Sequence, residues 1–475
     1  MSSESRIIVT SRRDFLKTAA AGSGGIAGIL SGRAVSAQTK TAVAATTALT
    51  AANGAHAAHT DTIQVALVGT GGRGTGAAAN AMSAKDGPVK LVAMADVLED
   101  RMKASYEGLI GEYGTKMDVP PERKFIGFDA YKHAMDALKP GDVVILTTPL
   151  AFRWVHFTYA IAKGLNVFME KPLIADGPSA KKMYALGEQA AAKNLKVGVG
   201  LMSRHSKALI ELHDRVQNGE IGDIILMRGY RMAGPLASAF SEKWPGTESE
   251  LLWQIRRFHS FIWASGGCFS DFYIHHIDHC CWMKNAWPVK AQALGGRHYR
   301  GNNVDQNFDS YSVEYTFPDN TKFLMDGRCM VGAVPMYHSF AHGTKGSAII
   351  SKNGDCGTPS SIYTSQSPVH DKMTWQSKDT SNPYQNEWDG LIDAIRNDKP
   401  WNEVKRGVDA SVATSMGRMA AHTAQEITWD DMLNSDQEFS PDSDKFTMDS
   451  PPPVMSDATG HYPVPMPGLK QKHEY

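Results

Sequence analysis

Short runs of β-branched residues alternate with helix-length segments from Thr62 to about residue 200. One segment with a helical pattern runs from Trp154 to Lys163 and ends at Gly164, a residue that commonly terminates helices. The runs that read as buried strands are Ile63–Val68, Leu91–Ala95, Val143–Leu146, Val167–Glu170 and Val197–Gly200. Because strands and helices alternate, residues 62–200 are predicted to form an α/β domain with a parallel, doubly wound sheet of the Rossmann dinucleotide-binding type.

The pattern changes after Met202. Tyr311, Val313, Tyr315 and Phe317 alternate with polar residues before a turn at residues 318–320, which predicts a half-buried antiparallel hairpin. Further strands are expected at Ile224–Tyr230, Lys290–Leu294 and Ser347–Ile350, and one stripe of a helix is formed by Trp388, Leu391, Ile392 and Ile395. Residues 201–433 are therefore predicted to form a C-terminal α+β domain with a large, open, mainly antiparallel sheet.

The two ends of the chain have their own patterns. Residues 1–37 contain Arg12 and Arg13 in "SRRDFLK", a weakly apolar run and the small residues Val35-Ser36-Ala37, which predicts a twin-arginine signal peptide. Residues 38–61 have few bulky side chains and are expected to be a disordered linker. Residues 434–475 are polar and proline-rich, and we expect an extended tail that packs on this subunit or on a neighbour. The signal predicts export to the periplasm, and the export machinery is then one partner.

The charge balance excludes some classes of partner. The chain has 49 Lys and Arg against 50 Asp and Glu, so no strong field favours nucleic acid or an anionic membrane. An open face on the second sheet would suit a homo-oligomer. The cysteines are too few and too irregularly spaced for a disulfide framework, and we expect most of them to be free and buried: Cys268, Cys280, Cys281, Cys329 and Cys356.

A glycine-rich loop follows the first predicted strand. Gly69, Gly71 and Gly74 form G-x-G-x-x-G before a predicted helix, and Asp96 ends the next strand about 20 residues on, which is the context of a dinucleotide fingerprint. Asp96 would accept hydrogen bonds from a ribose 2′-hydroxyl and repel a 2′-phosphate, so NAD is favoured, while Arg73 and Arg101 keep NADP possible. The residues expected to contact the cofactor are Gly69, Gly71, Gly72, Arg73, Gly74, Asp96, Thr148, Pro149, Glu170 and Lys171.

Two further motifs carry candidate chemistry. "MEKP" places Lys171 at the carboxyl edge of the sheet, where it could donate to a substrate hydroxyl beside a nicotinamide. Asp271, His275 and Asp278 are spaced to share one helix face, and a histidine can take the proton of an alcohol as hydride leaves. Two alternatives stay open: a metal site with His279 and Cys280, although the H-E-x-x-H pattern is missing, and a helix whose histidines are simply packed.

The glycine loop, "EKP" at Glu170–Pro172 and "SGGCFSDFYIHHID" at Ser265–Asp278 together resemble the Gfo/Idh/MocA oxidoreductases. The resemblance implies that Lys171, Asp271 and His275 act on a sugar hydroxyl. It also makes Arg204, His205 and Tyr230 pocket residues by similarity to a twin-arginine-exported, sugar-related branch. Tyr273 stands two residues before the histidine where the family often has glycine, so it too is expected to shape the substrate pocket.

The function predicted from these motifs is an exported NAD(P)-dependent oxidoreductase. Hydride would pass between a sugar, polyol or glycoside carbon and a tightly bound nicotinamide, with no metal required. Two alternatives remain: a redox-neutral, NAD-dependent glycoside hydrolase or lyase, and a non-catalytic carbohydrate- or nucleotide-binding protein. The presence of Lys171 favours the dehydrogenase over the first alternative, and the intact set of Lys171, Asp271 and His275 argues against the second.

Overall fold

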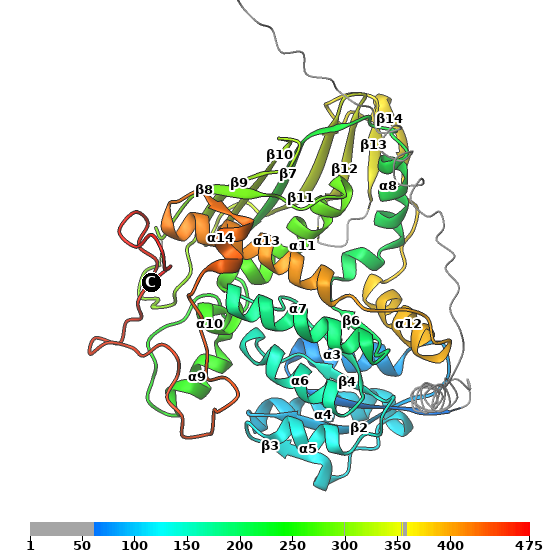
Figure 1. Ribbon diagram of the computed structural model, residues 1–475, viewed down its shortest axis with the longest axis vertical. Helices are drawn as coiled ribbons and strands as arrows, with labels where there is room; N and C mark the ends of the chain where they lie inside the picture. Colours follow the sequence, from blue (N-terminus) through cyan, green and yellow to red (C-terminus); the bar gives the residue numbers. More distant parts are fainter. Residues whose placement is uncertain (1–60, 299, 353, 355–358) are drawn as a thin grey trace, which may run out of the picture. The chain divides into compact units, whose positions relative to one another are not determined.

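Six parallel strands form the first sheet of the computed structural model, which describes residues 61–298, 300–352, 354 and 359–475 (Figure 1). The strands are β1 (Ile63–Val68), β2 (Val89–Asp96), β3 (Lys124–Ile126), β4 (Val143–Leu146), β5 (Asn166–Met169) and β6 (Val197–Val199). Their order in the sheet is β3-β2-β1-β4-β5-β6. This order reverses between β1 and β4, and such a point in a doubly wound sheet is where ligands bind. The predicted Rossmann domain is confirmed.

Both faces of this sheet are covered, and β1 contributes apolar side chains to the core on each of them. Ile63, Val65 and Leu67 pack against α3 (Gly72–Met82) and α4 (Glu99–Tyr113). Ala66 and Val68 belong to the core on the opposite face. The helices that contribute to that opposite core are α5 (Ala130–Asp136), α6 (Arg153–Ala162) and α7 (Gly177–Ala192).

One helix from the later part of the chain returns to the first sheet. The apolar stripe Trp388, Leu391, Ile392 and Ile395 lies on α12 (Pro383–Arg396), as the sequence predicts, but it packs in the core beside α3. The structure therefore corrects the boundary at residue 200, since α12 lies between two elements of the second domain along the chain and completes the core of the first.

The second sheet has nine strands in the order β14-β13-β12-β11-β7-β10-β9-β8-β15. Its neighbouring strands are antiparallel except for the parallel pair β7 and β10. The predicted hairpin joins β9 and β10 through a turn in which Asn320 N–H donates to the Phe317 carbonyl. The bounds are β7 (Ile224–Ala233), β8 (Lys290–Gly296), β9 (Ser310–Thr316), β10 (Lys322–Cys329), β11 (Met336–Gly343), β12 (Ser347–Lys352), β13 (Ser361–Tyr363), β14 (Met373–Gln376) and β15 (Ile427–Thr428). The predicted, mainly antiparallel sheet is confirmed.

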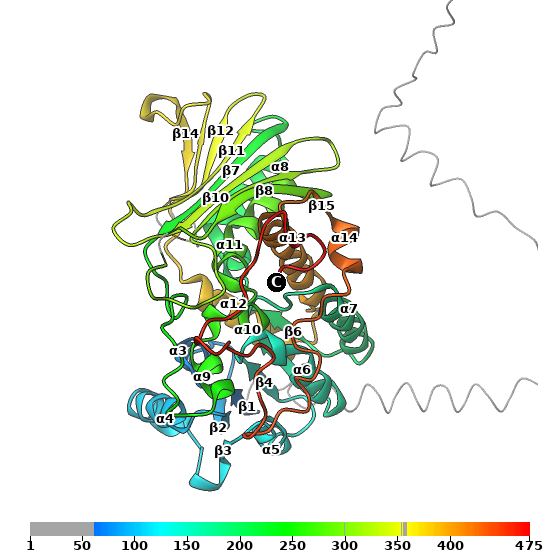
Figure 2. The ribbon, with the colours of Figure 1, turned by 90° about the vertical axis from the view of Figure 1, so that its left-hand side faces the viewer.

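Two long helices, α11 (Gly267–Lys284) and α13 (Val404–Thr423), pack on one face of this sheet (Figure 2). Nearly every side chain of α11 is buried, because the helix touches β7, β10 and β11 as well as α13. The opposite face of the sheet carries partly exposed apolar side chains, of which Leu294 is 78% exposed. The shorter helices are α8 (Lys207–Gln217), α9 (Glu250–Arg256), α10 (Ile262–Ser265) and α14 (Trp429–Asn434).

The tail at residues 434–475 packs on its own chain. Gln254 on α9 donates to the Val454 carbonyl at 2.7 Å, and the Tyr462 hydroxyl donates to Glu250 at 2.6 Å. Tyr462 also joins an apolar cluster with Trp253, Phe261 and Trp263. These aromatic residues therefore belong to the core of the described chain.

The predicted signal peptide and all but the last residue of the predicted linker lie outside the described residues, as do Tyr299 and Cys356. The other four cysteines are free and buried, as expected. Within the part of the chain that the structure describes, no helix is both long and apolar enough to cross a bilayer.

Candidate active site

The glycine loop lies between the carboxyl end of β1 and the start of α3. Gly69 has a φ of +94°, and a Cβ there would meet the backbone N of Thr148 at 2.7 Å, so a side chain is excluded. A Cβ at Gly71 or Gly72 would meet nothing within 4 Å. Backbone N–H groups at the start of α3 can therefore approach a ligand directly, and the helix N-terminus favours a phosphate there.

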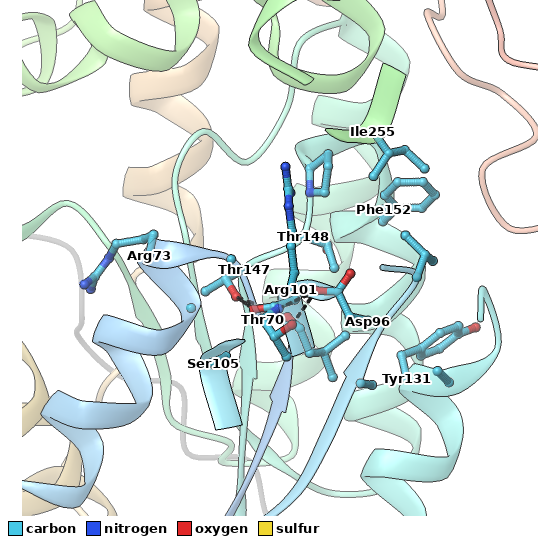
Figure 3. Close-up of a pocket in the computed structure, with 18 of the residues that line it drawn as sticks. Thr70, Arg73, Asp96, Arg101, Ser105, Tyr131, Thr147, Thr148, Phe152 and Ile255 are labelled. Carbon is cyan, nitrogen blue, oxygen red and sulfur yellow. Dashed lines mark hydrogen bonds between the residues drawn. The ribbon is translucent and has the colours of Figure 1, made fainter. Parts of the chain in front are cut away.

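A cavity of about 640 Å³ opens beside this loop (Figure 3). Its floor is made by the ends of β1, β2 and β4, which contribute Gly69, Asp96 and Thr147. Phe258 and His259, from the segment that follows α9, line its other side. The volume, the open glycines and the position at the switch point fit a dinucleotide.

Asp96 is fixed at the end of β2 by its neighbours. One carboxylate oxygen accepts from the Thr70 backbone N–H at 2.6 Å and from its hydroxyl at 2.8 Å, as the dashed lines in Figure 3 show. The other accepts from the Leu98 N–H at 3.0 Å. Arg101 also lines the cavity and donates to the Arg256 carbonyl at 2.7 Å, and burial lowers the pKa of Arg101. A carboxylate and a guanidinium therefore both lie in this part of the cavity.

A second cavity, of about 230 Å³, shares Thr148 and Pro149 with the first. The three residues predicted to be catalytic, Lys171, Asp271 and His275, all line it. Lys171 Nζ donates to the Asp271 backbone carbonyl at 2.7 Å and lies 3.8 Å from Asp271 Oδ1. The carboxyl end of β5 and the first half of α11 thus bring the two distant motifs together.

The charges of this cavity favour a neutral histidine. Burial, together with the charges of Lys171 and Arg231, lowers the pKa of His275 well below its usual value. No hydrogen-bond partner for the buried His275 Nδ1 is found among the described residues. Burial raises the pKa of Asp271, but the charge of Lys171 and a hydrogen bond from His259 outweigh this effect and lower it overall. The site therefore holds an ionised carboxylate and a histidine able to take a proton.

Glu170 and Arg73 form a pair at the edge of the second cavity. Arg73 Nε donates to Glu170, and the Arg73 guanidinium lies over the Tyr384 ring at 4.6 Å. Figure 3 shows Arg73 directed away from Asp96 and Arg101. A Cβ at Gly200 would meet Glu170 Oε2 at 2.5 Å, so this glycine leaves room for the carboxylate. Arg73 is thus held by Glu170 and does not lie beside Asp96.

Two of the expected substrate residues are engaged elsewhere. Arg204 forms a bidentate pair with Asp278, with a shortest distance of 2.7 Å, and lies over the Trp282 ring. His205 Nε2 lies 3.1 Å from Glu403 Oε1, and the His205 ring stacks on Trp401. Neither residue lines the cavity beside the glycine loop (the cofactor cavity) or the cavity that contains Lys171, Asp271 and His275 (the catalytic cavity). Asp278 lies seven residues beyond Asp271 on α11, and Arg204 neutralises this buried carboxylate. A role of Arg204 and His205 in binding substrate stays a prediction.

The other two expected substrate residues, Tyr230 and Tyr273, lie outside both cavities because of how the second sheet packs. Tyr230 is paired with Asp326 across β7 and β10, and its hydroxyl accepts from Arg228 at 3.2 Å. The face of the sheet that meets α11 carries instead Gly327, where a Cβ would collide with the Tyr273 ring. Tyr273 is 1% exposed and packs on Phe269 at 4.9 Å. It therefore fills the space between α11 and β10 and does not line either cavity.

The structure does not bring together the residues of the alternative metal site, His275, His279 and Cys280. His279 Nε2 lies 2.7 Å from the Ser339 hydroxyl on β11, and His275 lines the catalytic cavity. Throughout the described ranges, no three His, Cys, Asp or Glu side chains converge on a common point as metal ligands would.

Two residues at the site were missed by the sequence motifs. Arg153 is 2% exposed, lines the catalytic cavity and donates to the Thr148 carbonyl at 2.8 Å. His259 lines both cavities. No motif of the sequence marks His259, which stands beside Phe258 in an aromatic-rich stretch.

The chain is similar to known proteins over part of its length. No protein-family model matches it. The inositol 2-dehydrogenase of Pseudarthrobacter chlorophenolicus is 27% identical over 170 residues, which are 35% of this chain and 45% of that protein. The chain thus matches less than half the length of this relative.

Solved structures match over a longer stretch. The aldose-aldose oxidoreductase of Caulobacter crescentus, complexed with glycerol, superposes with a TM-score of 0.59 at 15% identity, over 78% of this chain and 100% of that one. The scyllo-inositol dehydrogenase of Lactobacillus casei, with bound NAD(H) and scyllo-inositol, gives 0.55 at 20% identity, over 78% and 100%. With the glycine loop, the E-K-P turn and the helix that carries Asp271 and His275, these comparisons confirm that the chain resembles the Gfo/Idh/MocA oxidoreductases and has their fold.

Proposed function

We propose that the protein is an oxidoreductase that transfers hydride between a carbinol carbon of a sugar or polyol and a nicotinamide cofactor. The observation that carries the proposal is the shared wall of the two cavities. Thr148 and Pro149 line both the cavity beside the glycine loop and the one that contains Lys171, Asp271 and His275. A cofactor in the first cavity would bring its nicotinamide to the hydroxyl of a substrate in the second.

The residues of the smaller cavity have distinct roles in this proposal. A bound nicotinamide would supply the hydride acceptor or donor. Lys171 donates to the substrate oxygen and polarises it, and neutral His275 takes the hydroxyl proton during oxidation and returns it during reduction. The Asp271 carboxylate faces Lys171 and holds the charged ammonium in position. A volume of about 230 Å³ suits one monosaccharide-sized ring.

NAD is the proposed cofactor. Asp96 at the end of β2 is an ionisable acceptor where a ribose 2′-hydroxyl would lie, and Arg73 is paired with Glu170. Arg101 also lines the cavity and is the cation that could bind the 2′-phosphate of NADP, but it already donates to the Arg256 carbonyl. Asp96→Ser should relax the preference, and the ratio of the dissociation constants of NAD and NADP would measure this effect.

Export and assembly are part of the same proposal. The "SRRDFLK" motif supports twin-arginine export, which predicts that the cofactor is loaded before translocation and recycled on the enzyme by a second substrate. The partly exposed outer face of the nine-stranded sheet supports a homo-oligomer. Replacing Arg12 and Arg13 by Lys should abolish export, which cell fractionation would detect.

The proposed function is tested by denaturing the purified protein, identifying any released nucleotide by mass, and adding sugars and polyols to the native protein while following absorbance at 340 nm. Reduction by one compound and reoxidation by a second would support a closed redox cycle. Cleavage of glycosides without a spectral change would favour the redox-neutral alternative. Failure to bind any nicotinamide nucleotide would contradict the proposal.

A further inference from the structure

We propose that His259 is a positioning residue of the active site, which holds the Asp271 carboxylate back from Lys171 so that the ammonium keeps two donors, and not one, for the substrate cavity. The proposal rests on the function proposed above for Lys171. It concerns a residue outside the motifs that carry the family resemblance.

The contacts of His259 form a chain across the site. Its Nε2 lies 3.3 Å from Asp271 Oδ2, and its Nδ1 lies 2.8 Å from the Ser238 hydroxyl. The imidazole ring stacks on the Phe272 ring, with 5.2 Å between ring centroids and an interplanar angle of 15°. The centroid of the Phe258 ring lies 3.8 Å from that of the imidazole. Both ring nitrogens and the ring face therefore have partners, and these partners fix the orientation of the imidazole.

The two sides of Asp271 are occupied by different groups. Lys171 Nζ approaches the backbone carbonyl at 2.7 Å but lies 3.8 Å from Oδ1, which is beyond hydrogen-bond distance. Oδ2 lies toward His259. A buried ammonium and a buried carboxylate this close attract each other strongly, so an untethered carboxylate would rotate to pair directly with Lys171.

This arrangement has a consequence for catalysis. An ammonium has three donors, and a direct bond to Asp271 in addition to the backbone carbonyl would leave Lys171 only one donor and draw Nζ toward α11. Holding the carboxylate at 3.8 Å keeps its charge near Lys171 while Nζ remains directed into the catalytic cavity that both residues line. His259 acts through Asp271 and needs no contact with the substrate for this role.

A matched pair of variants separates positioning from packing. His259→Phe keeps an aromatic ring against Phe272 but removes the N–H group, whereas His259→Gln keeps an N–H donor but loses the ring. If His259 positions Asp271, His259→Phe should lower kcat by about 10- to 100-fold, and His259→Gln should be the milder variant. The KM for the substrate and the affinity for NAD should change less than kcat in both.

A second measurement does not depend on activity. In crystal structures without cofactor, the Lys171 Nζ to Asp271 carboxylate distance should be about 3.8 Å in the wild type and about 3 Å or less in His259→Phe. This result would support the positioning role even if no sugar or polyol were oxidised by the wild type, so the two proposals can fail separately. An unchanged separation, or a His259→Gln variant more impaired than His259→Phe, would overturn the inference.

A third variant covers the case in which His259→Phe does not fold. Ser238→Ala removes the hydroxyl that lies against Nδ1 but keeps the backbone carbonyl, which accepts from Ser241 at 3.4 Å. It should shorten the Lys171 to Asp271 distance and lower kcat by a few-fold in the same direction. Wild-type distance and wild-type kcat in this variant would count against the positioning role.

Discussion

The protein contains two buried clusters that each combine a cation, a carboxylate and histidine, and they differ in what is left unpaired. In the proposed active site, Lys171, Asp271 and His275 face a cavity, and His275 Nδ1 has no hydrogen-bond partner among the described residues. In the second cluster, Arg418 makes three hydrogen bonds to Glu474, and His422 Nδ1 pairs with the same carboxylate.

The second cluster is saturated. Arg418 also donates to the Ala175 carbonyl at 2.6 Å and to Ser270 at 2.9 Å, and His422 Nε2 lies 2.9 Å from the Tyr311 hydroxyl. These bonds tie the tail to α13 and to the first turn of α11. Similar residue types are thus available for chemistry where a cavity leaves their polar atoms free, and hold elements together where every polar atom has a partner.

The largest difference between the clusters should appear on removing Lys171. We expect Lys171→Met to lower kcat/KM by about 10²- to 10⁴-fold with little change in the melting temperature, because in the proposed mechanism the side chain acts on the substrate oxygen. Lys196→Met is the matched control: Lys196 is 4% exposed but bonds Asn194 and Asp398, away from both cavities. It should cost stability and preserve activity, and loss of activity in both variants would erase the distinction.

The next largest effect should come from the saturated cluster. Glu474→Gln leaves Arg418 with a neutral partner, which should cost about 3 kcal/mol of unfolding free energy in urea denaturation. Activity per folded molecule should stay within a few-fold of the wild type. An unchanged free energy of unfolding would show that the buried pair does not hold the tail.

The acid dependence of stability follows from the same carboxylate. Burial raises the pKa of Glu474, but Arg418 and His422 outweigh this and lower it to about 2. A depressed pKa means that the stabilisation is fully present above the pKa of the unfolded chain, about 4.5, and is lost as pH falls toward 2. Below about pH 4.5, wild type should lose stability more steeply than Glu474→Gln, and parallel curves would contradict this.

The sequence predicts the fold and the core of the site because both depend on local patterns. Strands β1 and β4 begin and end where the apolar runs do, and Lys171 and Asp271 lie at motif positions. The sequence does not predict that Tyr230 and Tyr273 lie outside both cavities, because the direction of a side chain depends on which face of β7 or α11 meets its neighbours, and this depends on tertiary packing. His259 was missed because its role comes from Asp271 and Ser238, which are distant in sequence.

A smaller effect is expected at the open glycine loop. Gly71 has φ −66° and ψ 178°, and a Cβ there would meet no atom within 4 Å, so Gly71→Ala should not change stability. The methyl group would lie where a pyrophosphate approaches, and we expect NAD binding to weaken by about 10-fold. Isothermal titration would measure this change, and unchanged affinity would argue against the cofactor cavity.

The smallest effect should come from an exposed ion pair above that cavity. Arg256 pairs with Asp100 at 2.7 Å, and about a third of the Arg256 side chain is exposed. Arg256→Gln should change stability by less than about 1 kcal/mol. Because α9 continues into the segment that lines the cavity, release of NAD should become a few-fold faster, as stopped-flow fluorescence would show. A far larger loss of stability would contradict this.

The most direct test of the proposed function is a deuterium-transfer experiment. The protein loaded with NAD would be incubated with perdeuterated glucose and, separately, with perdeuterated myo-inositol and other perdeuterated polyols, and the nucleotide would be analysed by mass spectrometry. We predict reduced nucleotide one mass unit heavier than ordinary NADH with at least one substrate, and at least about 100-fold slower incorporation of deuterium with Lys171→Met. Nucleotide that binds but never acquires deuterium from any of these compounds would contradict the account.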